Sequence, residues 1–142
     1  MQVLDSSVFA SILVKDGFYD AARNLVKSGL RQENLTLELA FIEVANALWK
    51  HAYVLKRIRG DKYEALRDIV KPLISNSARV HSSLEVLEEA VDNAVKYGFP
   101  VYDSLYVTLA LRMKCRLVTF DEELRSRLVE KGLGDILSPL TP

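Results

Sequence analysis

Short strand-like runs alternate with helical patterns along this chain of 142 residues, and this alternation limits the folds open to it. The runs typical of short buried strands are residues 2–5, 34–37, 79–81 and 116–119, with 135–137 as a possible fifth. Apolar residues spaced three and four apart predict helices over residues 7–14, 18–28, 38–58, 62–74, 84–97, 103–114 and 122–130.

Strands that alternate with helices are usually parallel neighbours joined by right-handed crossovers. The sequence therefore predicts an α/β fold, a three-layer α/β/α sandwich around a central, mostly parallel sheet of four to five short strands. The length fits one domain over residues 1–142, because single domains cluster at ~100 to 150 residues. No internal repeat or interdomain linker interrupts the pattern.

The composition is that of a folded chain, with 49% hydrophobic and 27% charged residues. A single cysteine, Cys115, and two histidines are too few for a disulfide or a Cys/His zinc site, so a metal would be held by oxygen. Asp5 interrupts any secretory signal, and the apolar stretch 39–49 is shorter than the ~20 residues that span a bilayer. We expect a soluble, cytoplasmic protein.

Charge is unevenly distributed although the 19 basic and 19 acidic residues balance. Residues 50–62 are mainly basic, and residues 81–103 are mainly acidic. Such asymmetry suggests an anionic partner for one face of the molecule, although for any single charge a solvated helix face is the better interpretation. The basic residues of interest are Lys50, Lys56, Arg57 and Arg59.

Four acidic residues are expected at one edge of the predicted sheet. Asp5 ends the first strand, and Asp121 follows the strand at 116–119. Asp103 begins the helix that leads into that strand, and Glu43 lies about one turn into the helix after the second strand. The carboxyl ends of parallel strands and the starts of the helices that follow them share an edge, which is where such sheets bind ligands.

Helix capping explains three of these acids equally well when each is taken alone. Asp5 and Asp103 are each placed to cap a helix. Thr119 with Glu122 fits the capping box T-x-x-E, which would leave Asp121 as an ordinary first-turn acid. Capping is therefore the favoured interpretation of each of the three by itself.

Glu43 does not fit a capping role, because it lies inside the apolar stretch LAFIEVANALW. Asn46, three residues further on, is the other polar residue of that stretch and shares its helical face. An unpaired carboxylate buried there would lose several kcal/mol of hydration. Either a basic residue or a cation should meet it.

Gathering the acids would be costly without a counter-ion. Two carboxylates ~4 Å apart repel by roughly 4 kcal/mol at an effective dielectric of 20. Oxygen-only ligation suits Mg²⁺ or Mn²⁺, and such an ion commonly activates water for attack on phosphorus. Metal-assisted phosphodiester hydrolysis is therefore the candidate reaction. The small polar residues beside the acids that could orient ligands are Ser6, Ser7, Asn46 and Thr119.

The motifs VLDSSV, FIEVANAL, VYDSLYVTLA and LVTFDEEL, in this order, resemble the PIN-domain ribonucleases, and within them the VapC-type toxins of VapBC toxin-antitoxin pairs. The resemblance covers nearly the whole chain. It implies an α/β/α domain, Mg²⁺- or Mn²⁺-dependent endoribonuclease activity and a homodimer. It also implies inhibition by a VapB-type antitoxin whose C-terminal segment lies across the acidic groove.

The family motif maps onto four acids as metal-binding and catalytic residues, with Thr119 as the hydroxyl of T-x-D. Glu38 is the rival for the glutamate role, but only Glu43 is followed by Asn46 three residues later. Ser104 departs from the pattern, which more often has Ala there. The four acids are Asp5, Glu43, Asp103 and Asp121.

The resulting hypothesis assigns a role to each group. The three aspartates hold the ion directly or through water, Glu43 binds it or orients the attacking water, and Thr119, Ser6 and Asn46 support them. RNA phosphates would meet Lys50, Lys56, Arg57 and Arg59, with Arg112, Lys114 and Arg116 as alternatives. Tyr102, Tyr106 and apolar helix faces near the start of the chain are the candidate dimer surface.

Other function classes remain open at this point. A PIN nuclease of RNA maturation or decay would share the chemistry without an antitoxin. A phosphate-handling α/β domain, phosphorylated on the acid that ends the first strand, would want a second acid at the position of Ser7. An RNA-binding module with a vestigial acid pocket would show no effect of divalent ions on its melting temperature.

Overall fold

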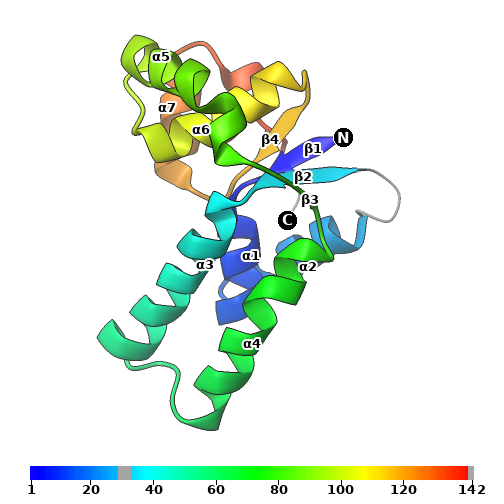
Figure 1. The fold of residues 1–142 in the computed structure, drawn as a ribbon, viewed down its shortest axis with the longest axis vertical. Coiled ribbons are helices and arrows are strands. Elements are labelled where there is room, and N and C mark those ends of the chain that lie inside the picture. The colour runs from blue at the N-terminus through cyan, green and yellow to red at the C-terminus, as the bar shows by residue number, and fades with distance from the viewer. Residues whose placement is uncertain (29–32, 141–142) are drawn as a thin grey trace.

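A four-stranded parallel sheet forms the centre of the molecule in a computed structural model that describes residues 1–28 and 33–140 (Figure 1). The strand order is β3-β2-β1-β4, and every neighbouring pair is parallel. This arrangement confirms the predicted α/β class. The strands are β1 (Gln2–Leu4), β2 (Asn34–Leu37), β3 (Arg79–His81) and β4 (Arg116–Val118).

Helices connect the strands and cover both faces of the sheet (Figure 1). The α-helices are α1 (Ser6–Val14), α2 (Tyr19–Ser28), α3 (Leu39–Trp49), α4 (Asp61–Ser75), α5 (Leu87–Tyr97), α6 (Val101–Arg112) and α7 (Glu122–Glu130). Three short helical segments join them, the π-helical η1 (Lys50–Val54) and the 3₁₀ turns η2 (Ser83–Val86) and η3 (Gly134–Ile136).

The sheet separates two hydrophobic cores, because successive residues of a strand point to opposite faces. Val3 and Leu117 belong to the core formed with α5, α6 and α7. Their neighbours Leu4 and Val118 belong to the core formed with α1, α2, α3 and α4. Both faces of the sheet are therefore covered, which confirms the three-layer arrangement.

The possible fifth strand at 135–137 is wrong. That stretch contains η3, and only Leu137 forms an isolated parallel bridge, to Leu117. The amide of Ser138 also donates to the carbonyl of Leu117 at 2.8 Å. One bridge is too short to be a strand, because the preceding residues turn through a 3₁₀ helix instead of extending.

The helix predicted over 38–58 ends earlier than expected. After Trp49 the hydrogen bonding changes to the wider π pattern, and the amide of Leu55 donates to the carbonyl of Lys50. Lys56 then adopts a left-handed backbone conformation with φ of 55°, which takes the chain out of the helix. The helix expected at 84–97 is likewise divided into η2 and α5.

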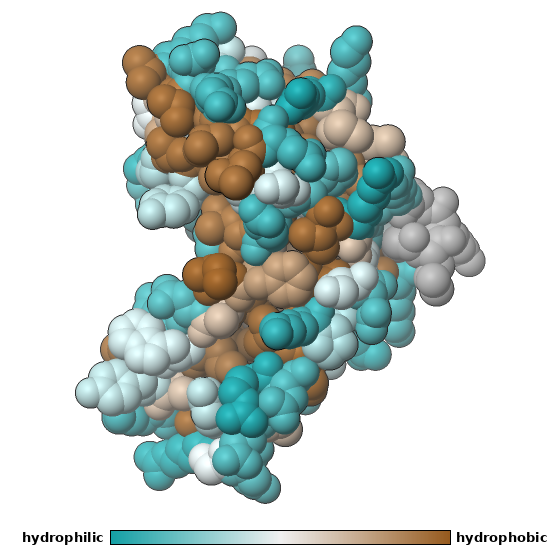
Figure 2. Space-filling model, viewed as in Figure 1, coloured by the Kyte–Doolittle hydropathy of each residue, from teal (hydrophilic) through white to brown (hydrophobic). Residues whose placement is uncertain are grey.

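Helices α3 and α4 project from the sheet side by side, as a two-helix arm (Figure 1). Figure 2 shows the surface hollowed between this arm and the body that contains α5 and α6. The carboxyl ends of β1 and β4 lead into α1 and α7 at this edge of the sheet. Within the described ranges, no helix is long and apolar enough to cross a membrane.

Candidate functional site

Asp5 is the buried centre of the candidate site, with 7% of its surface exposed. It stands at the N-cap position of α1, but its side chain caps no backbone N–H. Instead Oδ2 accepts hydrogen bonds from the hydroxyls of Thr119 and Ser7, each at 2.7 Å, and Oδ1 accepts from Ser6 at 3.3 Å. Burial raises the pKa of Asp5, and these hydroxyls partly oppose the rise. The side chain is held for a purpose other than capping.

Glu43 projects from α3 toward the same edge and is half-buried. Its Oε1 accepts a hydrogen bond of 2.7 Å from the hydroxyl of Tyr106. Burial raises the pKa of Glu43 to about 7, the Tyr106 hydrogen bond lowers it, and the charges of Asp5 and Asp103 raise it further. The expected buried glutamate therefore has a hydroxyl partner, and no cationic partner is found in the described residues.

Asp103 lies in the first turn of α6, three residues after the N-cap residue Pro100. It does not cap that helix, so the capping interpretation of Asp103 is wrong. Burial is the main cause that raises the pKa of Asp103 to about 6. The charges of Asp5 and Asp121 raise this pKa further, and the charge of Arg127 lowers it. Asp103 is thus within electrostatic range of two other acids of the predicted set.

Asp121 is itself the N-cap residue of α7, and its Oδ1 accepts from the amides of Glu123 at 2.9 Å and Leu124 at 3.0 Å. The capping box predicted for Thr119 and Glu122 is therefore wrong. The Thr119 hydroxyl donates to Asp5 and accepts from the amide of Asp121 at 3.1 Å. Asp121 combines a capping role with proximity to the other acids.

The four acids share one electrostatic environment without forming a ready-made metal cage. Asp5 raises the pKa of both Glu43 and Asp103, and Asp121 raises that of Asp5 and Asp103. In the parts of the chain that the structure describes, no three acidic, imidazole or thiol groups are close enough to hold one ion together. None of the four acids takes part in an ion pair there.

An oxygen-only set of this kind fits a hard divalent ion. Mg²⁺ retains several waters and binds through one or two carboxylates, so it does not need all four acids at direct ligating distance. Each acid with a raised pKa is destabilised as the anion by burial and by its neighbours, which a divalent cation would reverse. The chemistry of the donors is therefore compatible with Mg²⁺ or Mn²⁺.

A hollow of about 470 Å³ opens beside the acids and is lined in part by Ser6, Glu43, Asn46, Lys50 and Tyr102. Glu43, Asn46 and Lys50 follow one another at three- and four-residue spacing along one face of the helix. The structure thus brings Asn46 and Lys50 to the acidic site. A lysine at this position is placed to meet an anion that enters the hollow.

The other basic candidates lie further from the acids. Lys56 lines a different groove, and Arg57 and Arg59 are exposed in the connection between η1 and α4. This connection is at the free end of the two-helix arm (Figure 1). Of the four basic residues selected from the sequence, only Lys50 is therefore brought beside the acidic site.

Tyr106 differs from what the sequence suggested, and Glu38 does not. Tyr106 was expected on a dimer surface, which is wrong because only 1% of it is exposed and its hydroxyl holds Glu43. The signal was available, since Tyr106 follows Asp103 by three residues and so shares its helical face. Glu38, the rival for the glutamate role, accepts from the hydroxyl of Ser82 at 3.1 Å and the amide of Ser83 at 3.2 Å.

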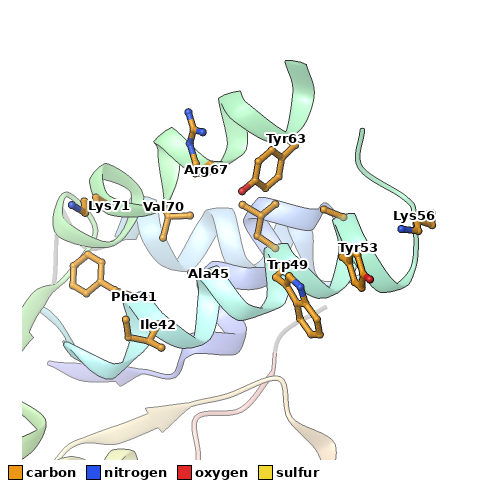
Figure 3. A pocket seen from close by; sticks show the side chains of 12 residues that line it. Phe41, Ile42, Ala45, Trp49, Tyr53, Lys56, Tyr63, Arg67, Val70 and Lys71 are labelled. Carbon is orange, nitrogen blue, oxygen red and sulfur yellow. The ribbon is translucent and has the colours of Figure 1, made fainter. Parts of the chain in front are cut away.

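An apolar groove of about 570 Å³ lies between α3 with η1 and α4 (Figure 3). Three of its residues are unusually exposed for their type, Ile42 at 70%, Trp49 at 52% and Tyr53 at 65%. Trp49 and Tyr53 stack with ring centroids 5.9 Å apart. The basic residues that line the groove are Lys56, Arg67 and Lys71.

The fold and the site define a class of protein, an α/β/α domain with acidic residues gathered at the carboxyl edge of a parallel sheet. The family model described as PIN domain matches residues 3–127. The chain belongs to the PIN domain family.

Two proteins of Pyrobaculum aerophilum are similar to it. The protein named Ribonuclease VapC3 is 37% identical over 128 residues, which cover 88% of this chain and 92% of that protein. The crystal structure of PAE2754 has a TM-score of 0.68 and 28% sequence identity, covering 89% of this chain and 78% of that one. The resemblance seen in the sequence is thereby confirmed.

Proposed function

We propose that this protein is an endoribonuclease that hydrolyses RNA phosphodiester bonds with the help of a divalent metal ion, and that it is the toxin of a VapBC-type pair. The observation that carries the proposal is the convergence of Asp5, Glu43 and Asp103, three buried or half-buried carboxyl groups with raised pKa values. The similarity to Ribonuclease VapC3 over most of both chains supports the same reading.

The residues proposed to hold Mg²⁺ or Mn²⁺ are Asp5, Glu43, Asp103 and Asp121. When bound, such an ion supplies a water of lowered pKa and neutralises charge on the phosphate oxygens. The hydroxyls of Thr119 and Ser7 both donate to Oδ2 of Asp5, and the hydroxyl of Ser6 donates to Oδ1. These hydroxyls fix the direction in which Asp5 presents its oxygens.

Glu43 is proposed to bind the ion or to orient the attacking water. Glu43 lines the hollow, where its carboxylate can accept a hydrogen bond from a water molecule. Asn46 lines the same hollow and offers an amide to water or to RNA. The RNA would enter as a single strand or a loop, because buried acids at a sheet edge cannot reach the backbone of a rigid duplex as easily.

Lys50 is the first proposed contact for RNA phosphate, because it lines the hollow that contains Glu43. Lys56, Arg57 and Arg59 would meet phosphates further along the arm. Contacts of this type raise affinity without selecting sequence, and each neutralised phosphate steepens the salt dependence of binding.

The direct test is RNA cleavage by the variants Asp5→Asn and Asp103→Asn in Mg²⁺. Loss of several kcal/mol of charge stabilisation predicts a decrease in rate of about 100-fold or more. Asp92→Asn is the matched control, since Asp92 is an exposed acid of α5 with no ion pair among the described residues. A folded Asp5→Asn or Asp103→Asn variant that cuts RNA at the wild-type rate would remove that residue from the mechanism.

A VapB-type antitoxin is the proposed protein partner. The groove between α3 and α4 supports this, because apolar residues as exposed as Ile42, Trp49 and Tyr53 are costly unless another surface covers them. Its apolar floor fits the hydrophobic face of an amphipathic helix, and Lys56, Arg67 and Lys71 would meet acidic residues on that helix. The proposed partner segment is therefore amphipathic and acidic.

A homodimer is also proposed. Figure 2 shows a hydrophobic patch over α5. On this helix Val91 and Val95, four residues apart, are 41% and 83% exposed, and Leu84 in the adjoining η2 is 70% exposed. A face of this kind suits a symmetric contact in which the same patch meets itself.

A further inference from the structure

A buried tyrosine connects the two helices that supply acids to the site. The hydroxyl of Tyr106, on α6, donates a 2.7 Å hydrogen bond to Oε1 of Glu43, on α3. The two residues are 63 positions apart in the chain, so this contact exists only in the folded protein. It ties Glu43 to α6 through one short hydrogen bond.

The ring of Tyr106 has almost no freedom to move. It is 1% exposed and is the largest of the fully buried side chains. Its neighbours Leu105 and Val107 are buried as well, and all three belong to the core that also contains residues of the sheet and of α5. A side chain in a close-packed core keeps one rotamer, so its hydroxyl is a donor at a fixed position.

Asp103 and Tyr106 are three residues apart and share one face of α6. The same rigid helix therefore presents one acid of the site directly and holds a second acid through the tyrosine. A phenol keeps its proton at neutral pH, so the Tyr106 hydroxyl is a donor to Glu43. A donor of this kind stabilises an anion in one orientation.

We propose that Tyr106 is a positioning residue for Glu43, a role that rests on the proposed metal-dependent nuclease function. By occupying Oε1 it fixes the carboxylate plane and leaves Oε2 as the oxygen presented to a divalent ion or to the attacking water. Groups that orient a ligand through a hydrogen bond change metal affinity or activity by about 10-fold to 100-fold when they are removed. Without Tyr106, Glu43 would rotate among several rotamers.

The test is Tyr106→Phe, which removes one oxygen atom and preserves the ring. We expect Mn²⁺ to bind about 10-fold more weakly in isothermal titration calorimetry and the cleavage rate at saturating RNA to fall by a similar factor, with the KM for RNA unchanged. In a Glu43→Ala background the same substitution should change Mn²⁺ affinity by less than about twofold, because residues that act as one unit are not additive.

Ser104→Ala is the matched control on α6. It removes another buried hydrogen bond, from the Ser104 hydroxyl to the carbonyl of Ala90 at 2.6 Å, without touching an acid. We expect this variant to have a lower melting temperature than the wild type and the same Mn²⁺ affinity. An equal loss of Mn²⁺ affinity in Ser104→Ala and Tyr106→Phe would mean a general packing effect and would overturn the inference.

The remaining outcomes separate this inference from the proposed function. Wild-type protein that binds Mn²⁺ but cuts no RNA would contradict the nuclease proposal, and the Mn²⁺ affinities would still decide the role of Tyr106. Three outcomes would each overturn the positioning role. The Tyr106→Phe variant could bind Mn²⁺ as tightly as the wild type, the substitution could reduce Mn²⁺ affinity equally with and without Glu43, or the wild-type protein could bind no Mn²⁺.

Discussion

At the scale of single residues, Asp5 occupies the N-cap position of α1 without capping the helix. Its backbone starts α1, yet its carboxylate accepts three hydroxyl hydrogen bonds instead of capping the helix. The two shortest come from Ser7, the second residue of α1, and from Thr119, which follows β4. The neighbouring strands β1 and β4 are thereby linked through one buried anion.

Thr119→Val is expected to lower the free energy of unfolding by about 1 to 3 kcal/mol, because it leaves a buried carboxylate with one donor fewer. Cleavage should fall as well, since Asp5 would no longer be held at Oδ2. Urea denaturation and an RNA cleavage assay measure the two effects. Thr108→Val is the control, because Thr108 is equally buried and bonds only Asn93. It should lose stability and keep its activity, and a parallel loss of activity would argue against a specific role of Thr119.

Glu43 and Asp103 predict how the stability of the metal-free protein depends on pH. Their pKa values of about 7 and about 6 are higher than those of unfolded carboxyl groups, so the folded state holds these protons longer as the pH rises. Where the folded state binds more protons, the free energy of unfolding falls with increasing pH. The contribution of these two groups to the free energy of unfolding is therefore largest below about pH 4 to 5. This contribution is lost as the pH rises through about 6 and 7.

Thermal unfolding in EDTA between about pH 5 and pH 8 tests this dependence. The melting temperature of the wild-type protein should decrease across the range. Glu43→Gln should show a smaller decrease, because the titrating group is gone while the hydrogen bond from Tyr106 can persist. A melting temperature that rises between these pH values would contradict the shared environment inferred for the acids.

At the scale of elements, the change from α3 to η1 shapes the surface of the two-helix arm. The π-helical turn is wider than an α-helical turn, and segments of this type are often found at functional sites. Here Trp49 and Tyr53 lie on either side of the transition and line the groove that faces α4 (Figure 3). The arm therefore carries the acidic site at its base and an apolar groove along its length.

The double variant Trp49→Ala with Tyr53→Ala is expected to weaken antitoxin binding by about 100-fold or more, because exposed aromatic residues are common hot spots worth ~2 kcal/mol or more each. RNA cleavage by the free variant should be unchanged, since neither residue lines the acidic hollow. Calorimetric titration of the purified antitoxin measures the affinity.

Ile69→Ser provides the control for this experiment. Ile69 is an apolar residue of α4 that is 45% exposed but is not among the residues that line the groove. Its substitution should leave antitoxin affinity at the wild-type value. Equal binding by the double variant and the wild type would remove the groove from the proposed interface.

At the scale of the whole molecule, the acidic site stores repulsion that a divalent ion should relieve. Addition of Mg²⁺ or Mn²⁺ is expected to raise the melting temperature, because ligands that bind only the folded state stabilise it by mass action. The increase should be larger at about pH 8 than at pH 5, where protons occupy the raised carboxyl groups instead. Asp5→Asn should show a smaller increase, and no increase in the wild type would contradict the metal site.

The proposed dimer makes a separate prediction. Val95→Lys places a charge on the exposed face of α5 and should shift the protein toward a monomer, because a charge facing its own copy across a two-fold axis is repulsive. Light scattering coupled to size exclusion measures the mass. Val129→Lys, at a residue of α7 that is 63% exposed, is the control. A dimer that persists in Val95→Lys would rule out this face.

Most of the architecture could be predicted from the sequence because local periodicity reports it directly. All four main strands were found within one residue of their bounds, as were helices such as α7. The errors occur where apolar spacing does not report the backbone hydrogen bonding. The helix α3 ends at Trp49 and passes into a π-helical turn, and Leu137 forms only an isolated bridge to Leu117 of β4. One domain over residues 1–142 stays a prediction.

The acidic residues of the candidate site could be selected from the sequence, but most of their hydrogen-bond partners could not. A carboxylate inside an apolar helix indicates Glu43 by itself, because burial without a partner is too costly. Spacing places Tyr106 on the helical face of Asp103, but nothing local indicates that its hydroxyl donates to Glu43, or that Thr119 donates to Asp5 from 114 positions away. Lys50 and Arg57 also look equivalent in the sequence, and only the direction of the arm separates them.

The sequence by itself determined most of the strand and helix pattern and the family, and it nominated the four acids, because each of these is written in residue type and spacing. The tertiary structure alone decided which side chain meets which. Hydrogen bonds and repulsion between charges act over a few ångströms in space, and residues distant along the chain come within that range only when the sheet and its two layers of helices assemble.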